Sequence, residues 1–388
     1  MESDLRRTWA EVNLDAIAYN YRKIKEKTGK DVKFLGVVKA DAYGHGSVQV
    51  SKLLAEEGAD YLAVSSADEA LELRVNGIKM PILILGHTPK EQVEELIKYD
   101  ITQAVTCKAK ADEYSREAVN CGGTLKIHIK VDTGMSRLGY LCDNGLFDTG
   151  VEGIVEACNL PGLYAEGIFT HFAEADEFGE AADDYTKHQF ELFKNVIDKV
   201  EEKGVKFKIR HCANTGAVAR YPETYLDMVR PGLLLYGYGE FAKEMGLKPA
   251  MTLKTTVSTI KIYPEGTAIS YGGIYVTDKK TRIGVLPYGY ADGFLRALSN
   301  KCSLYTREGL APLRGKICMD MCMIDITDMM TVDVGSEVEV FGEKNPIEKL
   351  SEIAGTIPYE LTCAVSKRVP RMYIKGGKVV EKELMLRL

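Results

Sequence analysis

The stretch from Val32 to Gly46 carries a lysine where a buried strand would end. Lys39 directly follows the apolar run 34–38, and a short loop with Tyr43 and His45 comes next. The run has the length and composition of a buried parallel strand. Burial at its end would favour a neutral amine, the form that condenses with a carbonyl to make a Schiff base. A lysine that carries its charge into solvent is the alternative, and this stretch alone leaves both open.

Other polar side chains follow apolar runs in the same half of the chain. A single polar residue at a strand end says little, because loops are polar anyway. Together, however, a lysine, two arginines and a histidine are expected at the same end of the strands. That combination favours a functional site over unrelated solvated side chains. The residues expected at strand ends, besides Lys39, are Asp132 to Arg137, Thr170, His171, His211, Asn214 and Thr215, and Arg230, Pro231 and Gly232 are expected within the eighth strand.

The same half of the chain predicts the strands and helices that would place these residues at one end of a sheet. Between Val32 and about Leu235, short apolar runs alternate with amphipathic stretches, which is typical of repeated βα units. Helices are expected at 66–76, 90–99 and 183–202, where charged residues mark an outer face. Eight units predict a (β/α)8 barrel of the TIM type, with its chemistry at the carboxyl ends of the strands. The expected strands are 33–38, 60–64, 82–85, 102–105, 125–131, 162–169, 206–211 and 228–233.

The pattern changes after Tyr236 and becomes rich in β structure. We therefore predict an α/β chain with an N-terminal (β/α)8 barrel over 1–240 and a mostly β C-terminal domain over 241–388. The start of the chain is expected to associate with the second domain. Strands are expected in this domain at 253–263, 281–287, 311–325 and 337–341, with turn signals between them.

Composition bounds the function. With 45% hydrophobic and 27% charged residues among 388, the chain has ample material for a core. A formal net charge of -6 argues against a nucleic-acid surface and favours small-molecule partners. The charged opening and the lack of a long apolar segment predict a cytoplasmic protein. Nine scattered cysteines fit reduced thiols better than a disulfide framework, and no metal site is expected.

A series of sequence blocks resembles the bacterial alanine racemases nearly end to end. One block would be weak, but this many in the right order across both expected domains are highly specific. The blocks are TWAEVNLDAI, VVKADAYGHG, HIKVDTGMSRLG, EGIFTHFAEAD, HCANTGA, MVRPGLLLYG, ISYGG, GYADGFLRALS, GKICMDMCMIDI and TIPYELTCAVSKRVPR.

The resemblance implies a homodimer with one pyridoxal phosphate (PLP) per barrel and active sites shared between subunits. Lys39 would hold PLP as an aldimine and act as one base. Tyr271 of ISYGG would be the second base, reaching in from the partner. Racemisation removes the α-proton from one face and returns a proton to the other, so a base is needed on each side. The product would be D-alanine for peptidoglycan.

The resemblance also assigns supporting groups around the two bases. His171 and Arg230 match the histidine of THF and the arginine of VRPG. Arg230 would donate to the PLP pyridine nitrogen and, because arginine stays protonated, keep that nitrogen neutral. A neutral pyridine is a weaker electron sink, which would suppress transamination.

The phosphate would be held by neutral donors, and the substrate by a separate set. Arg137 would bond the PLP phenolate oxygen and the alanine carboxylate, and Lys130 matches a lysine that is carbamylated in several family members. Met319 would contact the carboxylate through its backbone, while Tyr290, Tyr359 and Arg296 would narrow the entrance. The residues expected around the cofactor are Tyr43, Asn214, Thr215, Gly232, Leu233 and, from the partner, Tyr359.

Rival functions remain to be weighed against these motifs. A racemase of the same fold acting on serine, lysine or another amino acid is disfavoured by bulky Tyr359 at the substrate methyl. A PLP-dependent decarboxylase would carry a glycine-triplet loop and a cysteine block that are missing from the sequence. A non-catalytic PLP carrier would lack the second domain. Two departures from the family pattern are Ser136 in DTGMSRLG and Lys316 in GKICMD, where many relatives carry arginine.

Overall fold

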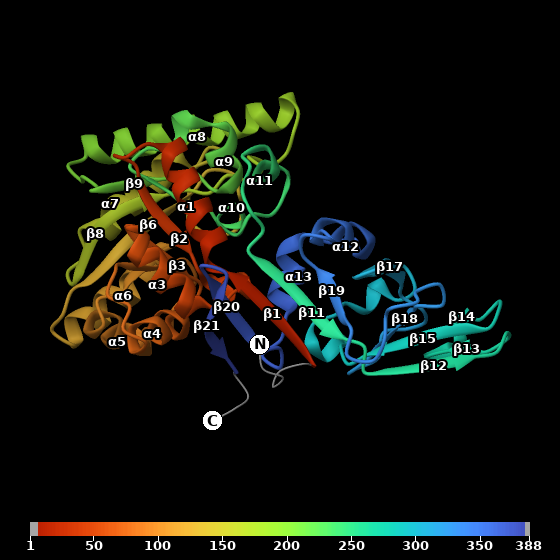
Figure 1. The fold of residues 1–388 in the computed structure, drawn as a ribbon. Helices are drawn as coiled ribbons and strands as arrows, with labels where there is room; N and C mark the ends of the chain where they lie inside the picture. Colours follow the sequence, from red (N-terminus) through yellow and green to blue (C-terminus); the bar gives the residue numbers. More distant parts are fainter. Residues whose placement is uncertain (1–6, 385–388) are drawn as a thin grey trace. The chain divides into compact units, whose positions relative to one another are not determined.

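The computed structural model describes residues 7–384, which form two compact units. One unit comprises Asn20–Ala42 and Ser47–Leu235, and the other comprises residues 7–19, Tyr43–Gly46 and 236–384. We call them the barrel unit and the β unit (Figure 1).

The barrel unit is built on parallel strands whose buried residues are mostly apolar. Within residues 7–384, eight parallel strands follow the order β10-β2-β3-β4-β5-β6-β8-β9, and the short β7 pairs with β6. Backbone bonds from Asp227 to Arg210 and from Arg230 to Ala213 bring the two ends of this order together. The barrel expected from the sequence is therefore confirmed, and its ring of strands is nearly closed. Its strands are β2 (Lys33–Val37), β3 (Tyr61–Val64), β4 (Ile82–Ile84), β5 (Thr102–Val105), β6 (Leu125–Asp132), β7 (Tyr140–Leu141), β8 (Leu163–Phe169), β9 (Ile209–His211) and β10 (Met228–Val229).

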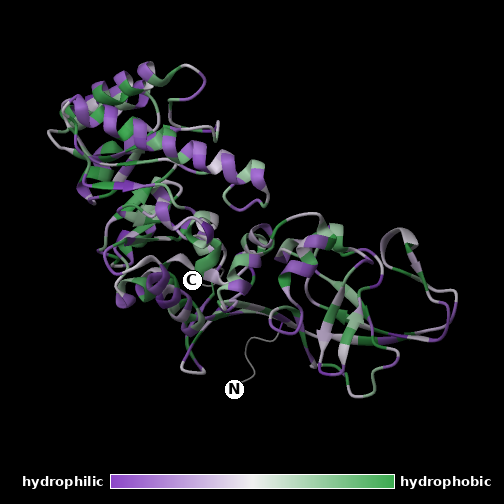
Figure 2. Ribbon diagram, turned by 90° about the horizontal axis from the view of Figure 1, so that it is seen from above, coloured by the Kyte–Doolittle hydropathy of each residue, from purple (hydrophilic) through white to green (hydrophobic). Residues whose placement is uncertain are grey.

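Helices follow these strands, and their burial patterns are amphipathic. Figure 2 shows hydrophobic colour concentrated on the strands, with hydrophilic and hydrophobic residues mixed along the helices. In α8 (Glu180–Glu202) the buried positions recur at helical spacing, so one face covers the barrel. The other helices are α1 (Leu14–Thr28), α2 (Lys39–Tyr43), α3 (Ser47–Glu57), α4 (Ala67–Val75), η1 (Lys90–Gln92), α5 (Val93–Lys98), α6 (Lys108–Asn120), α7 (Phe147–Cys158), α9 (Thr215–Arg220), η2 (Pro222–Thr224) and α10 (Leu233–Tyr236).

The β unit is organised around a seven-stranded sheet that joins distant parts of the sequence. Its order is β17-β16-β19-β11-β1-β20-β21, so β1 lies between β11 and β20. A three-stranded sheet, β12-β15-β18, and the hairpin β13-β14 complete it. The strands are β1 (Thr8–Asn13), β11 (Met251–Thr256), β12 (Thr259–Tyr263), β13 (Ala268–Ile269), β14 (Tyr275–Val276), β15 (Thr281–Leu286), β16 (Ser303–Thr306), β17 (Gly309–Pro312), β18 (Cys322–Asp325), β19 (Glu337–Phe341), β20 (Arg371–Lys375) and β21 (Lys378–Glu383).

Short helices connect these strands, and two of the expected long strands are broken. The range 253–263 is split between β11 and β12, which belong to different sheets. The range 311–325 is interrupted after Pro312, because proline lacks a ladder donor and Gly315 takes a positive φ of 76°. The helices are α11 (Glu240–Glu244), η3 (Tyr271–Gly273), η4 (Tyr290–Asp292), η5 (Arg296–Leu298), α12 (Ile347–Ala354) and α13 (Pro358–Ala364).

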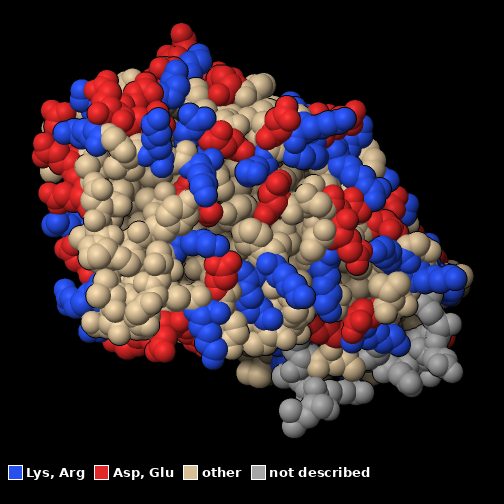
Figure 3. Space-filling model, turned by 90° about the vertical axis from the view of Figure 1, so that its left-hand side faces the viewer, with Lys and Arg blue, Asp and Glu red and all other residues tan. Residues whose placement is uncertain are grey.

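The distribution of surface charge and the state of the cysteines can be compared with the expectations from the sequence. On the face in Figure 3, acidic and basic side chains are interspersed and do not gather by sign. That distribution lacks the basic footprint of a nucleic-acid surface on this face. All nine cysteines are free, as expected of reduced thiols. Among residues 7–384, no helix combines the length and apolarity needed to cross a membrane.

Candidate active site

The residues expected on the barrel lie where its strands end. Lys39 lies two residues after the end of β2, Arg137 lies in the loop after β6, and His171 follows β8. Arg230 was expected within the eighth strand but follows it, because β10 ends at Val229 and α10 begins at Leu233. Carboxyl ends of parallel barrel strands share one face, so these groups line the same mouth.

Lys39 is presented by a backbone turn of unusual hand. The four residues after it, Ala40 to Tyr43, have φ values between 51° and 54°, which is the left-handed region. For residues with a Cβ this conformation costs about 1–2 kcal/mol each. Lys39 itself is half-buried. Runs of strained backbone persist only where the surroundings determine them, and they cluster at functional sites.

Specific hydrogen bonds hold this turn. The amide of Ala40 donates to Oε1 of Glu69 at 2.7 Å, and the amide of Ala42 donates to the carbonyl of Val38 at 2.8 Å. The carboxylate of Asp41 accepts from the amide of Ser47 at 2.8 Å. The turn is therefore fixed at both ends, which restricts where the Lys39 side chain can begin.

Arg230 is a buried cation surrounded by acceptors. Its NH2 nitrogen donates to the carbonyl oxygens of Thr170, at 2.8 Å, and Cys212, at 3.1 Å. The same nitrogen lies 3.3 Å from Nδ1 of His171, and NH1 lies 3.0 Å from Nδ1 of His211. Burial lowers the pKa of Arg230 to about 10, so the guanidinium stays protonated near neutrality. Both histidines must then accept at Nδ1, because guanidinium has only donors.

A third histidine, His128, extends this arrangement along the barrel interior. Nδ1 of His128 lies 2.9 Å from Nε2 of His211. Nε2 of His128 faces Oε2 of Glu166 at 3.5 Å, and the Tyr61 hydroxyl donates to the same carboxylate oxygen at 2.7 Å. His128 and the Tyr61 hydroxyl hold the pKa of Glu166 to about 2. A carboxylate thus stands at one end of the row and Arg230 at the other.

His128, Glu166 and Tyr61 were missed in the reading of the sequence. A signal existed in the spacing of the strand HIKVD. His128, Lys130 and Asp132 alternate with apolar residues, and alternate residues of a strand share a face. Three polar side chains on one face of a fully buried strand indicate a polar barrel interior. Nothing local indicated Glu166, which reaches this face from another strand.

Lys130 is a buried amine beside two arginines. Its Nζ donates to the carbonyl of Val131 at 2.6 Å and lies 5.5 Å from the centre of the Phe169 ring. Burial, with Arg230 and Arg137 nearby, lowers the pKa of Lys130 to about 7. A substantial fraction of the amine is neutral at neutral pH. Burial and Arg230 likewise lower the pKa of His171, which is neutral there.

The residues expected at the phosphate lie around the start of α9 and α10. Asn214 caps α9, its side chain accepting from the amide of Ala217 at 3.1 Å. The hydroxyl of Thr215 accepts from the amide of Gly232 at 3.0 Å, which leaves its proton to donate. Gly232 and Leu233 are buried. Hydroxyl and amide donors at helix starts suit an oxyanion.

The second group of expected residues lies on the β unit. Tyr271 is 68% exposed in a turn between β13 and β14, and Met319 is 53% exposed. The amides of Tyr290 and Ala291 donate to the carbonyls of Cys318 and Met319, both at 3.0 Å. These residues line one hollow of about 880 Å³, formed by Tyr271, Tyr290, Arg296, Ile317, Met319 and Asp320.

Tyr359 departs from the expectation that it comes from the partner. Its ring centroid lies 5.4 Å from that of Tyr43 in the same chain. The reason is close packing: a Cβ on Gly44 would come within 2.2 Å of the carbonyl oxygen of Thr362 in α13. The assignment of Tyr359 to the partner's side was therefore wrong. Burial raises the pKa of Tyr43 above its usual value, so its phenol stays protonated as a donor.

Comparison with known proteins agrees with this geometry. The family model described as alanine racemase, N-terminal domain, matches residues 12–240, and the C-terminal domain model matches residues 250–373. The chain belongs to the alanine racemase family. The resemblance noted in the sequence is confirmed, and the enzyme class is that of the family, an amino-acid racemase.

Relatives in the alanine racemase family match over their full lengths. The chain is 43% identical to alanine racemase 2 of Caldanaerobacter subterraneus subsp. tengcongensis, with 100% of both chains covered. It is 45% identical to alanine racemase of Clostridium tetani, with 98% of both covered. The solved alanine racemase of Clostridium difficile 630 superposes with a TM-score of 0.93 at 39% identity, covering 99% of this chain and 100% of that one.

Proposed function

We propose that this chain interconverts L-alanine and D-alanine with pyridoxal phosphate as cofactor. The observation that carries the proposal is the match of the two family models to residues 12–240 and 250–373. Within these ranges Lys39 lies just after β2 in the barrel unit, and Tyr271 is exposed on the β unit. A racemase needs a base on each face of the α-carbon. The product would be D-alanine for cell-wall peptidoglycan.

The donor set of the barrel unit suits this cofactor. Arg230 would present a cation to a ring nitrogen. The hydroxyl of Thr215, which accepts from the Gly232 amide and keeps its own proton, would with the Leu233 amide offer neutral donors to a phosphate. Tyr43, four residues after Lys39 in the chain, would add a phenol donor. When bound, pyridoxal phosphate supplies a carbonyl carbon that condenses with an amine and an electron-withdrawing ring that acidifies the α-proton.

The residues of the chain would divide the remaining work. Lys39 would hold or release a proton on one face of the substrate α-carbon, and Tyr271 on the other. Arg137 and the backbone of Met319 would bind the carboxylate, and Tyr290 and Tyr359 would exclude water and larger side chains. His171, neutral and with its proton on Nε2, would be a hydrogen-bond donor to the second base.

We infer that the enzyme works as a homodimer with shared sites. Tyr271 and Met319 are exposed in the single chain and line an open hollow with Tyr290 and Arg296. Exposed apolar and aromatic side chains around a hollow are typical of surfaces that a partner covers. The hollow would face the barrel mouth of the second copy, with Tyr271 acting there in trans.

We also propose that Lys130 is carbamylated. Its lowered pKa supports this, because only a neutral amine attacks carbon dioxide. A carbamate would turn a cation between Arg137 and Arg230 into an anion that orients Arg137. The test is a carbamate signal in carbon-13 spectra under labelled bicarbonate. Its absence in Lys130→Met would support the assignment, whereas an equal signal in that variant would overturn it.

The central experiment is a chiral assay of the purified chain with L-alanine, D-alanine and L-serine, with and without added pyridoxal phosphate. We expect alanine to be interconverted only with the cofactor, and Lys39→Ala to be inactive. Faster racemisation of serine than of alanine would assign the chain to a different substrate. No interconversion of any of the three at any cofactor level would overturn the proposal.

A further inference from the structure

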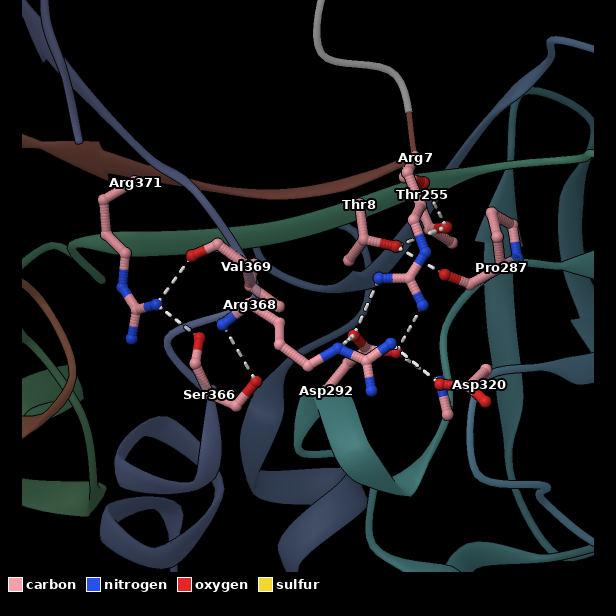
Figure 4. Close-up of polar contacts among 11 residues, drawn as sticks. Arg7, Thr8, Thr255, Pro287, Asp292, Asp320, Ser366, Arg368, Val369 and Arg371 are labelled. Atoms are coloured by element: carbon pink, nitrogen blue, oxygen red, sulfur yellow. Dashed lines mark hydrogen bonds and ion pairs between the residues drawn. The ribbon is translucent and has the colours of Figure 1, made fainter. Parts of the chain in front are cut away.

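Asp292 is a fully buried carboxylate at the end of η4, held by arginines from the two ends of the chain (Figure 4). NH1 of Arg7 donates to Oδ1 at 2.9 Å, and NH2 of Arg7 donates to Oδ2 at 3.1 Å. Nε of Arg368 lies 3.4 Å from Oδ1. The carboxylate is thus held by a bidentate fork and a second cation, the geometry in which a buried ion pair is well compensated.

The same arrangement continues to the loop that carries Met319. NH2 of Arg368 donates to Oδ1 of Asp320 at 2.7 Å. Asp320 follows Met319 directly and lines the same hollow as Tyr290. Two arginines therefore face two aspartates, so the group carries no net charge. We call Arg7, Asp292, Asp320 and Arg368 the charged junction.

Backbone contacts at the junction leave little room for movement. Oδ2 of Asp292 accepts from the amide of Gly289 at 3.0 Å, which closes the turn that contains Tyr290. A Cβ on Gly289 would lie 2.4 Å from the carbonyl oxygens of both Cys318 and Met319, so only glycine permits this approach. The turn and the Met319 loop are consequently packed backbone to backbone.

The segment that follows α13 is hydrogen-bonded to the backbone of Asp292. The amide of Ser366 donates to the carbonyl of Asp292 at 3.1 Å. Arg371, 2% exposed, donates to the carbonyl oxygens of Ser366 and Val369, both at 2.7 Å (Figure 4). It also donates to the carbonyl oxygen of Val365 at 2.6 Å, and so stiffens the stretch that presents Arg368. Tyr359 lies on the helix that this stretch continues.

We propose that Asp292 is a positioning residue: through Arg7 and Arg368 it holds the segments bearing Tyr290, Met319 and Tyr359 in one geometry, and so sets alanine affinity and selectivity. This rests on the proposed function, in which those three residues touch substrate. Asp292 itself lies in the interior of the β unit and acts through others. Removing its charge would take away the carboxylate that Arg7 binds and leave Arg368 with Asp320 alone, which would loosen the walls without altering Lys39 or Arg230.

The test compares Asp292→Asn with Asp333→Asn, a control that removes an exposed carboxylate 3.9 Å from Arg282 in the same unit. For Asp292→Asn we expect the KM for alanine to rise about tenfold while kcat changes by less than about threefold. Serine turnover relative to alanine should also rise. The control should match the wild type. If Asp292→Asn does not fold, Arg7→Gln and Arg368→Gln carry the same expectation at about threefold.

A rescue and a structural readout separate this proposal from the general one. Arg368→Lys keeps the charge, so its KM should lie between those of the wild type and Arg368→Gln. Hydrogen exchange at the amides of Tyr290 and Ala291 should quicken in Asp292→Asn while barrel strands stay protected. Folded variants with unchanged KM, selectivity and exchange would overturn the role of Asp292. An inactive wild type with quickened exchange in the variant would overturn only the proposed function.

Discussion

Nδ1 of His128 and Nε2 of His211 lie 2.9 Å apart, and this contact determines which nitrogen of each ring carries the proton. His211 must accept from Arg230 at Nδ1, so its proton lies on Nε2 and is donated to His128. The proton of His128 then lies on Nε2, toward Glu166. Burial lowers the pKa of both rings, so each is neutral. Hydrogen-bond donation therefore runs in one direction along this row, from the buried guanidinium of Arg230 to the carboxylate of Glu166.

Glu166→Gln tests whether this direction matters to catalysis. The amide keeps the shape of the side chain but removes the charge that faces His128. We expect kcat for alanine racemisation to fall about tenfold with little change in KM, because Arg230 would be less firmly held. Glu156→Gln, which removes an exposed partner of Lys108 on the same unit, is the control. Equal kinetics in the two variants would contradict a role for Glu166.

The lowered pKa of Lys130 predicts a pH dependence of stability. The folded chain releases this proton at about pH 7, whereas the unfolded chain retains it to about pH 10.5. Unfolding between these values takes up a proton, so the stability of the wild type should rise with pH, by up to about 1.4 kcal/mol per unit. Lys130→Met should lack this rise. Denaturant melts of both in buffer freed of carbon dioxide, from pH 7 to 10, measure it, and parallel curves would contradict the prediction.

The left-handed turn after Lys39 predicts a stabilising glycine. Ala40 is exposed and has φ and ψ of 51°, a conformation that glycine adopts freely. Ala40→Gly should raise the free energy of unfolding by up to about 1 kcal/mol. Ala109→Gly, at an exposed position of α6, should instead lower it by about 1 kcal/mol. Thermal or urea melts compare the two, and destabilisation by both variants would refute a left-handed turn.

Sites shared between two copies predict complementation. Lys39→Ala and Tyr271→Ala should each be inactive as pure proteins. After mixing and subunit exchange, a heterodimer has one site with both bases and one with neither, so about one quarter of wild-type activity should return. Mixing two samples of Lys39→Ala is the control. No recovery despite exchange shown by mass-tagged subunits would mean that the site forms within one chain.

The sequence predicted those elements of the fold whose pattern is carried by residues close together in the chain. Each of the eight barrel strands was expected within a few residues, because a buried parallel strand is an unbroken apolar run between helices. β20, which pairs with β1 and with the neighbouring β21, was not expected as a strand. Neither was β1, because both of its partners, β11 and β20, lie more than a hundred residues away along the chain. A strand stabilised by such a partner leaves a weak local pattern.

The residues of the candidate site likewise divide into those that were predicted from the sequence and those that were missed. Lys39 and His171 stand in recognisable blocks and lie just after strands as expected, whereas Arg230 follows its strand and was expected within it. The row from His128 to Glu166 was not predicted, because it depends on which residues of β6 and β8 face inward at the same level. The side from which Tyr359 arrives could not be read either, since motif order does not say which copy contributes a residue. The cytoplasmic location expected from the sequence stays a prediction.

The position of β1 has a consequence for synthesis on the ribosome. This strand is synthesised before the barrel, yet it pairs with β11 (Met251–Thr256) and β20 (Arg371–Lys375), which are synthesised after the barrel. The barrel strands, which pair mostly with their sequence neighbours, can form while translation continues. β1 must therefore remain unpaired until β11 has left the exit tunnel, and it gains its second partner only after β20 has followed. A truncated product would expose two strand edges, the feature that invites aggregation.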